Sequence, residues 1–123
     1  MAKSHPLLER VLPALQGVGA ARSRAMFGGF GVYLDDVIVG IIAWNRLFFR
    51  TDARNRPDYE AAGSAPFAYE GRSGKPIEMP YWELPADVLD DPARLGAWAL
   101  KARAASLADP RRQKSGRKSG KKR

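Results

Sequence analysis

Three apolar segments between residues 26 and 51 follow one another with only two polar residues between each pair. The segments are Met26–Leu34, Val37–Trp44 and Leu47–Thr51, separated by Asp35-Asp36 and Asn45-Arg46. A two-residue connection is too short for a parallel crossover, so neighbouring segments must pair as antiparallel strands. Asn tolerates the positive φ that such tight turns require. The sequence therefore predicts a three-stranded antiparallel meander.

Helical patterns precede and follow this meander. Apolar residues recur at helical spacing over Leu7–Leu15, with Ser4 as the expected N-cap. Pro13 is expected to kink or end this helix. After the meander, Pro57 near the start and Gly63 just past the end frame a second, short helix.

The last part of the domain predicts two more strands and a final helix. Pro66–Glu70 and Lys75–Glu83 have strand character, and Pro80 within the second favours an edge position or a bulge. Asp91 is the expected N-cap of the last helix, with Pro92 in its first position. The predicted order is α-β-β-β-α-β-β-α, an α+β domain with a two-layer antiparallel sheet and helices packed on it.

The charge divides the chain into a balanced domain, residues 1–109, and a basic tail, residues 110–123. The domain carries thirteen Lys/Arg and thirteen Asp/Glu, and the tail carries eight cations and no acid, which accounts for the net charge of +8. The tail has no apolar side chain after Pro110, so we expect it to be disordered. It is either a nonspecific DNA- or RNA-binding arm or a solubilising extension. Its cations are Arg111, Arg112, Lys114, Arg117, Lys118, Lys121, Lys122 and Arg123.

Composition excludes several classes of site. Without cysteine there is no disulfide framework, no thiolate metal site and no Cys nucleophile, and His5 is the only histidine. The longest apolar run, Val37–Trp44, is much shorter than the ~20 residues that span a bilayer. We therefore expect no cofactor, no metal, no catalytic residue and no membrane partner, and a cytoplasmic location.

The second strand indicates a protein partner. Val37, Val39 and Ile41 alternate with Ile38, Ile42 and Trp44, so the strand is apolar on both faces and should be covered on both. The three short helices that the sequence predicts are few to cover both faces of the sheet. We therefore expect a homodimer in which a second copy of the chain covers one face of the sheet.

Two motifs that resemble catalytic sites have simpler structural explanations. The glycine-rich string has no further glycine at the offset that a dinucleotide-binding loop requires, and no Lys-Ser/Thr pair of a Walker loop follows it. We therefore interpret its glycines, Gly28, Gly29 and Gly31, as a bulge or a close backbone contact with a helix. The acidic pairs Asp35-Asp36 and Asp90-Asp91 fall in a turn and at a helix start, where Asp satisfies backbone N–H groups. The strand aromatics and the arginines around the first three strands are expected to be core and mixed solvated surface, respectively.

Three stretches together resemble one known family, the TfoX (Sxy) N-terminal domain. They are Arg24–Tyr33, Ala62–Phe67 and Tyr81–Pro85, and the resemblance extends over about Leu7–Ala108. It implies a two-layer α+β fold of the secretion-chaperone-like type, without known catalytic residues or a cofactor. The residues that carry it are Met26, Phe27, Gly28, Gly29, Gly31, Tyr33, Gly63, Pro66, Phe67, Tyr81 and Pro85.

The resemblance also implies a function in bacterial competence regulation, alongside a cyclic-AMP receptor protein. Longer members carry a C-terminal domain that resembles helix-hairpin-helix modules, whereas this chain runs from its last helix into the basic tail. The sequence thus predicts a non-enzymatic regulatory or adaptor domain, with a transcription-machinery protein as a partner. The alternative is a small-molecule binding module or enzyme with a pocket where the Gly-rich strand, Tyr81 and Trp82 meet.

Overall fold

A computed structural model describes residues 5–26 and 29–109 and confirms the α+β class. The first half contains one helix and four strands, α1 (Pro6–Gln16), β1 (Ala21–Met26), β2 (Gly29–Leu34), β3 (Val37–Ala43) and β4 (Arg46–Arg50). The second half contains α2 (Arg56–Ala61), β5 (Pro66–Glu70), β6 (Pro76–Glu83), α3 (Ala86–Leu89) and α4 (Pro92–Leu107).

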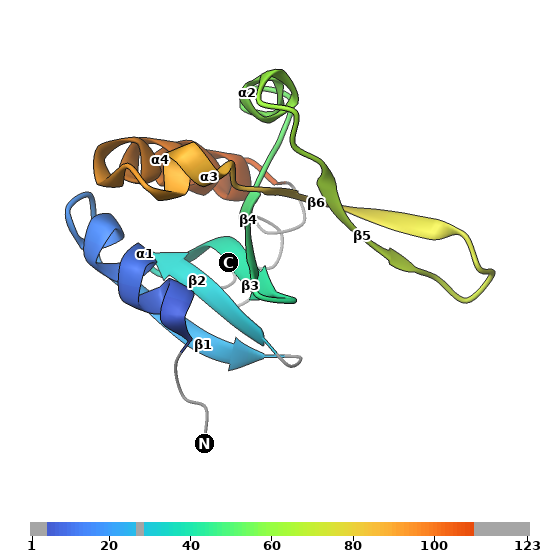
Figure 1. The fold of residues 1–123 in the computed structure, drawn as a ribbon, viewed down its shortest axis with the longest axis horizontal. Coiled ribbons are helices and arrows are strands. Elements are labelled where there is room, and N and C mark those ends of the chain that lie inside the picture. The colour runs from blue at the N-terminus through green and yellow to red at the C-terminus, as the bar shows by residue number, and fades with distance from the viewer. Residues whose placement is uncertain (1–4, 27–28, 110–123) are drawn as a thin grey trace, which may run out of the picture.

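The six strands form one antiparallel sheet in the order β1-β2-β3-β4-β6-β5. The predicted meander is confirmed, because β2, β3 and β4 are consecutive neighbours. Helices α1 and α4 pack against each other and against the same face of this sheet, and the β5–β6 hairpin extends from the body as an arm (Figure 1). We call the face turned away from α1 and α4 the outer face.

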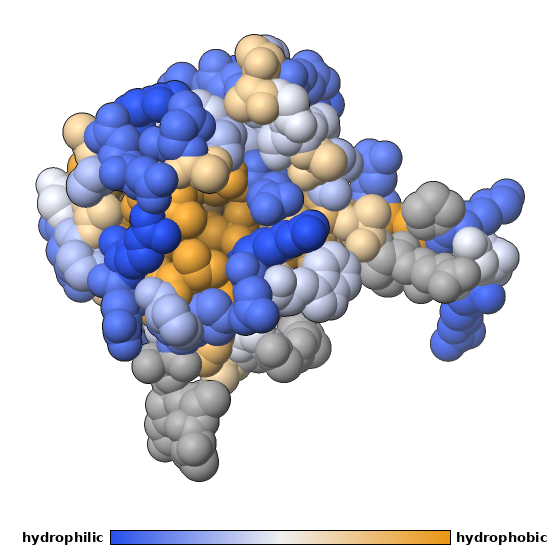
Figure 2. All heavy atoms as spheres, viewed as in Figure 1, coloured by the Kyte–Doolittle hydropathy of each residue, from blue (hydrophilic) through white to orange (hydrophobic). Residues whose placement is uncertain are grey.

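The core lies between the sheet and these two helices. Leu8, Val11 and Leu15 of α1 meet Leu95 and Ala99 of α4 above the strands. From the sheet, alternate residues of β2, β3 and β4 enter the same cluster, namely Phe30, Val32, Ile42, Leu47 and Phe49. Figure 2 shows apolar side chains gathered in a hollow between α1 and α3, within a hydrophilic surround.

Both tight turns of the meander use left-handed backbone. Asp35 and Asp36 have φ of 52° and 65°, as predicted for a two-residue hairpin turn. The next turn is centred on Trp44 and Asn45, with φ of 53° and 60°, and not on Asn45-Arg46 as predicted. A bulky residue in this conformation is a genuine outlier, because its Cβ crowds the backbone.

Two elements were missed from the sequence. The glycine-rich strand begins at Gly29 and is preceded by β1 (Ala21–Met26). This strand has small and charged side chains up to Ala25 and a large apolar one only at Met26, so it shows no apolar period. Helix α3 spans only four residues, too few for a periodic signal. Phe27 and Gly28 lie outside the described residues.

The start of α1 differs from prediction in two ways. His5 is the N-cap, and its Nδ1 accepts a hydrogen bond from the Leu7 amide at 3.1 Å; the predicted cap, Ser4, lies outside the described residues. The helix also continues through Pro13 to Gln16, so proline does not end it. The apolar side of α1 packs on the core, which outweighs the hydrogen bond that proline cannot donate.

Bulges change which side chains share a face. The β2–β3 register shifts at Val32/Tyr33, so Val39 and Ile42 both enter the core and the simple alternation expected for this strand fails. The pairing of β5 with β6 shifts in the same way opposite Pro80. Pro80 therefore lies in a bulge, as one alternative predicted, while β6 is an interior strand and not an edge.

Within the described ranges, 5–26 and 29–109, no helix has the length and apolar character needed to cross a membrane.

Candidate functional site

The outer face of the sheet brings together residues from family-motif stretches that are far apart in the sequence. Gly31 and Tyr33 point to it from β2, because their neighbours Phe30, Val32 and Leu34 enter the core. Tyr81 reaches the same face from β6, beside Arg50. Phe67 reaches it from β5 and packs on Phe48 of β4. Motif residues from three separate stretches thus share one surface.

The remaining motif residues are structural. Gly29 begins β2 and lies against the backbone of β3, and Gly63 follows α2 with φ of 77°, as the expected helix-ending glycine. Pro66 begins β5, and Pro85 is the N-cap of α3. Met26 ends β1, while Phe27 and Gly28 lie outside the described residues.

One row of directly paired residues crosses the outer face. Arg24 pairs with Gly31, Gly31 with Ile41, Ile41 with Phe48, and Phe48 with Glu83. The row therefore runs from a cation on β1, through a glycine and two apolar side chains, to an acid on β6. Arg24 is exposed, and the Glu83 carboxylate lies 3.8 Å from the Arg46 guanidinium.

An aromatic cluster surrounds Phe48, the residue that β4 contributes to this row. Phe48 is buried because the rings of Phe67 and Trp44 pack against it, with centroids at 5.1 and 6.5 Å. The Trp44 ring also stacks on the Phe67 ring at 4.9 Å. Trp44 itself is 63% exposed at the tip of its turn. A large ring in such a position is typical of an interface anchor.

A second cluster lies at the end of the sheet where the β2–β3 turn is. Arg22 lies over the Tyr33 ring and pairs with Asp36 at 2.7 Å, while Arg50 lies over the Tyr81 ring. Burial raises the pKa of the Tyr81 hydroxyl, and the Arg50 charge opposes that rise. Tyr81 therefore keeps its proton at neutral pH and presents a neutral ring to Arg50.

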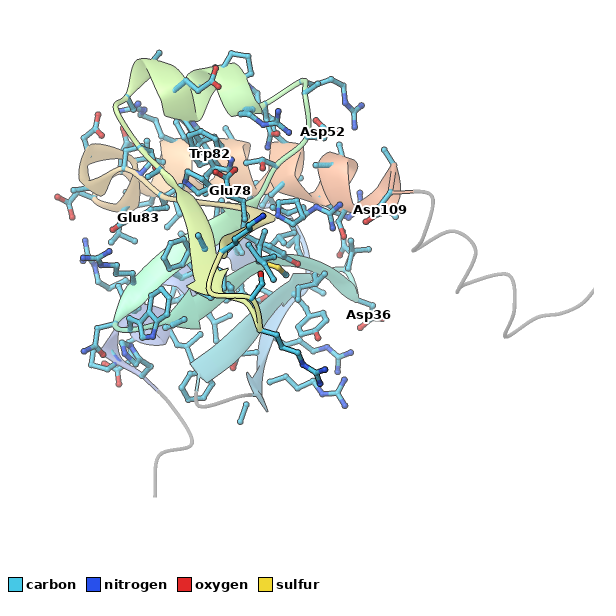
Figure 3. All side chains as sticks on the ribbon, turned by 90° about the vertical axis from the view of Figure 1, so that its right-hand side faces the viewer. Asp36, Asp52, Glu78, Trp82, Glu83 and Asp109 are labelled. Carbon is cyan, nitrogen blue, oxygen red and sulfur yellow. The ribbon has the colours of Figure 1, made fainter. Side chains whose placement is uncertain are left out.

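The C-terminus of α4 is held next to this second cluster. Arg50 Nη2 donates to Asp109 Oδ2 at 2.7 Å, and the two side chains are only 13% and 10% exposed. Figure 3 shows Asp36 and Asp109 on the same side of the molecule, with Glu83 on the other. The basic tail, which begins at the next residue, lies outside the described residues.

A wide groove of about 550 Å³ lies under α2. Trp82, Glu78 and Pro80 of β6 face Arg56 and Glu60 of α2 across it, and Figure 3 shows Trp82 and Glu78 below this helix. The expected pocket between the Gly-rich strand, Tyr81 and Trp82 is absent from the described part of the chain. Strands β3 and β4 separate β2 from β6, and Tyr81 and Trp82 point to opposite faces.

The charged side chains are mostly paired with one another. Asp91 caps α4 through the amides of Ala93 and Arg94, as predicted. Of the arginines around the meander, Arg22, Arg46 and Arg54 are exposed and each pair with an acid, which agrees with a mixed surface. Arg50 is different, because it is largely buried with Asp109 and is not part of a solvated surface. Over residues 5–26 and 29–109, no three His, Asp or Glu side chains are placed to hold a metal ion.

Gly29 has a close backbone contact, but the neighbour differs from the one expected. A Cβ at this position would lie 2.0 Å from the carbonyl oxygen of Ile42 on β3, whereas the expectation was a helix. The glycine therefore allows two strands to approach each other. This is a structural role, which argues against a phosphate-binding loop at this position.

The fold and this surface define a small α+β domain in which three separate motif stretches meet on the outer face of one sheet. The family model for the TfoX N-terminal domain matches residues 13–106, so the chain belongs to this family. The family supports a regulatory or adaptor domain in general and is not known as enzymatic. No curated protein matches the chain.

Proposed function

We propose that this chain is a non-enzymatic regulatory adaptor that binds protein through the outer face and nucleic acid loosely through its basic tail. The observation that carries the proposal is the convergence of Gly31, Tyr33, Phe67 and Tyr81 on one face of the sheet. These residues come from all three stretches of the family motif. Tyr33 and Phe67 are partly exposed and present rings at this face, while Gly31 and Tyr81 are buried in it, and an aromatic surface of this kind suits docking more than bond-breaking chemistry.

The proposed setting is the bacterial cytoplasm, where the adaptor contributes to regulating competence genes with a transcription-machinery protein. Family membership supports this proposal. In the proposal the nucleic-acid contact is made by residues 110–123, which carry eight cations and no acid.

Binding through the tail predicts a steep salt dependence. Eight cations that each neutralise one phosphate give a log–log slope of affinity against salt of up to roughly −7, from about 0.9 per phosphate. Replacing all eight by Gln in the full chain should lower the affinity for a 20-base-pair duplex by at least about 100-fold at low salt and flatten the slope. Fluorescence anisotropy over a salt series measures both quantities.

A matched control changes charge on the domain instead of the tail. Arg56, Arg72 and Lys75 have no ion pair with an acid among the described side chains and lie outside the row on the outer face, so their replacement by Gln removes cations without freeing an acid. This triple variant should keep most of the affinity and slope. Equal losses in the two variants would show that the tail is not the nucleic-acid arm.

A further inference from the structure

The row across the outer face is complementary to itself. Its five positions are Arg24, Gly31, Ile41, Phe48 and Glu83, with Ile41 at the centre. A two-fold axis parallel to the strands and passing over Ile41 would exchange the two ends of the row. Arg24 of one copy would then lie over Glu83 of the other, twice per dimer. Gly31, which has no side chain, would lie opposite the aromatic cluster in which Trp44 and Phe67 cover Phe48.

We infer that the protein that occupies the outer face is a second copy of this chain, packed sheet against sheet about that axis. The inference rests on the proposed function of this face as a docking surface and names its partner. Packed sheets lie about 10 Å apart and roughly 30° from parallel, a separation that two long side chains such as Arg and Glu can bridge. An axis perpendicular to the strands would instead place Arg24 near Arg24 of the second copy, which is repulsive.

The free side chains of this surface agree with such a contact. Arg24 is exposed and has no acid partner within the described residues, and Glu83 has only the 3.8 Å contact with Arg46. Trp44 is held in a left-handed backbone conformation that Asn or Gly would adopt with less strain. An interface role explains why this position holds an exposed tryptophan, because its ring, together with Phe67, would anchor the second copy.

A charge swap tests this arrangement in the full-length chain. Sedimentation equilibrium should show a dimer of the wild type at 100 µM, a concentration chosen to detect dissociation constants up to about that value. Arg24→Glu and Glu83→Arg should each weaken the dimer by at least about 10-fold, because each places like charges together twice. The double variant R24E/E83R should return to within about 3-fold of the wild type. The control Arg72→Glu, at the tip of the β5–β6 arm, should not change the dimer.

Trp44→Asn separates the interface from folding. Asn suits the left-handed turn, which offsets part of the packing that the Trp44 ring makes with Phe48 and Phe67, so the melting temperature should fall by no more than about 5 °C, while the dimer weakens by about 30-fold or more. A monomeric wild type at 100 µM, or a double swap that fails to restore the dimer, would overturn the inference. Nucleic-acid binding is measured separately on the tail variant. Its failure with an intact dimer would count against the proposed tail function and leave this interface standing.

Discussion

Gly29→Ala should lower the free energy of unfolding by about 3 kcal/mol or more, the largest effect we expect from a single methyl group in this chain. The added Cβ would lie 2.0 Å from the carbonyl oxygen of Ile42 and 3.2 Å from its carbonyl carbon. Both atoms are backbone, so relief requires β2 and β3 to separate and not merely a side-chain rotation. Urea unfolding followed by circular dichroism measures the loss.

A second motif glycine gives a matched control. Gly63 has φ of 77° but no atom within 4 Å of the position of a Cβ, so Gly63→Ala meets strain in the backbone and no clash. It should cost about 1 kcal/mol. Equal losses in the two variants would show that the close approach of β2 to β3 is not what requires a glycine at position 29.

Asp109→Ala should cost about 3 kcal/mol, because it leaves the Arg50 guanidinium largely buried without its carboxylate. Removing both charges in Arg50→Met/Asp109→Leu should recover most of that loss, since no buried charge is then left unpaired. The four variants of this cycle, compared by urea unfolding, isolate the coupling between the two side chains. A double variant as unstable as Asp109→Ala alone would contradict the assignment.

An exposed ion pair provides the comparison. Arg10 and Asp90 also form an ion pair between two helical regions, but their side chains are 49% and 68% exposed. Asp90→Ala should therefore change stability by no more than about 1 kcal/mol. The contrast between Asp90 and Asp109 tests whether burial sets the energy of these pairs. It also tests whether the buried pair is what holds the end of α4 against β4.

Local signals predicted elements correctly where the local chain decides the structure. The two-residue turns require β2, β3 and β4 to pair as neighbours, and Asp91 with Pro92 marks the start of α4. The prediction failed for β1 because this strand pairs in the sheet with β2 alone and its side chains before Met26 are small or charged. A strand of that kind forms by completing a sheet and not through its own apolar pattern.

The candidate site was predicted in part. The motif residues were named from sequence, but their shared surface was not, because Gly31, Phe67 and Tyr81 are separated by long stretches of chain. Trp44, Arg50 and Asp109 were not recognised as important. The tryptophan sat in a turn assigned one residue late, and the Arg50–Asp109 pair joins residues 59 positions apart.

The amino-acid sequence alone predicted the α+β class, the hairpin pairing of the central strands and the family resemblance. It also separated a neutral domain from a cationic end. These depend on periodicity, turn chemistry and charge, which act over a few residues. Only the tertiary structure decided that β6 inserts between β4 and β5, and that Arg24 and Glu83 end one row. Strand order and bulges depend on packing between distant segments, whose energies no local pattern records.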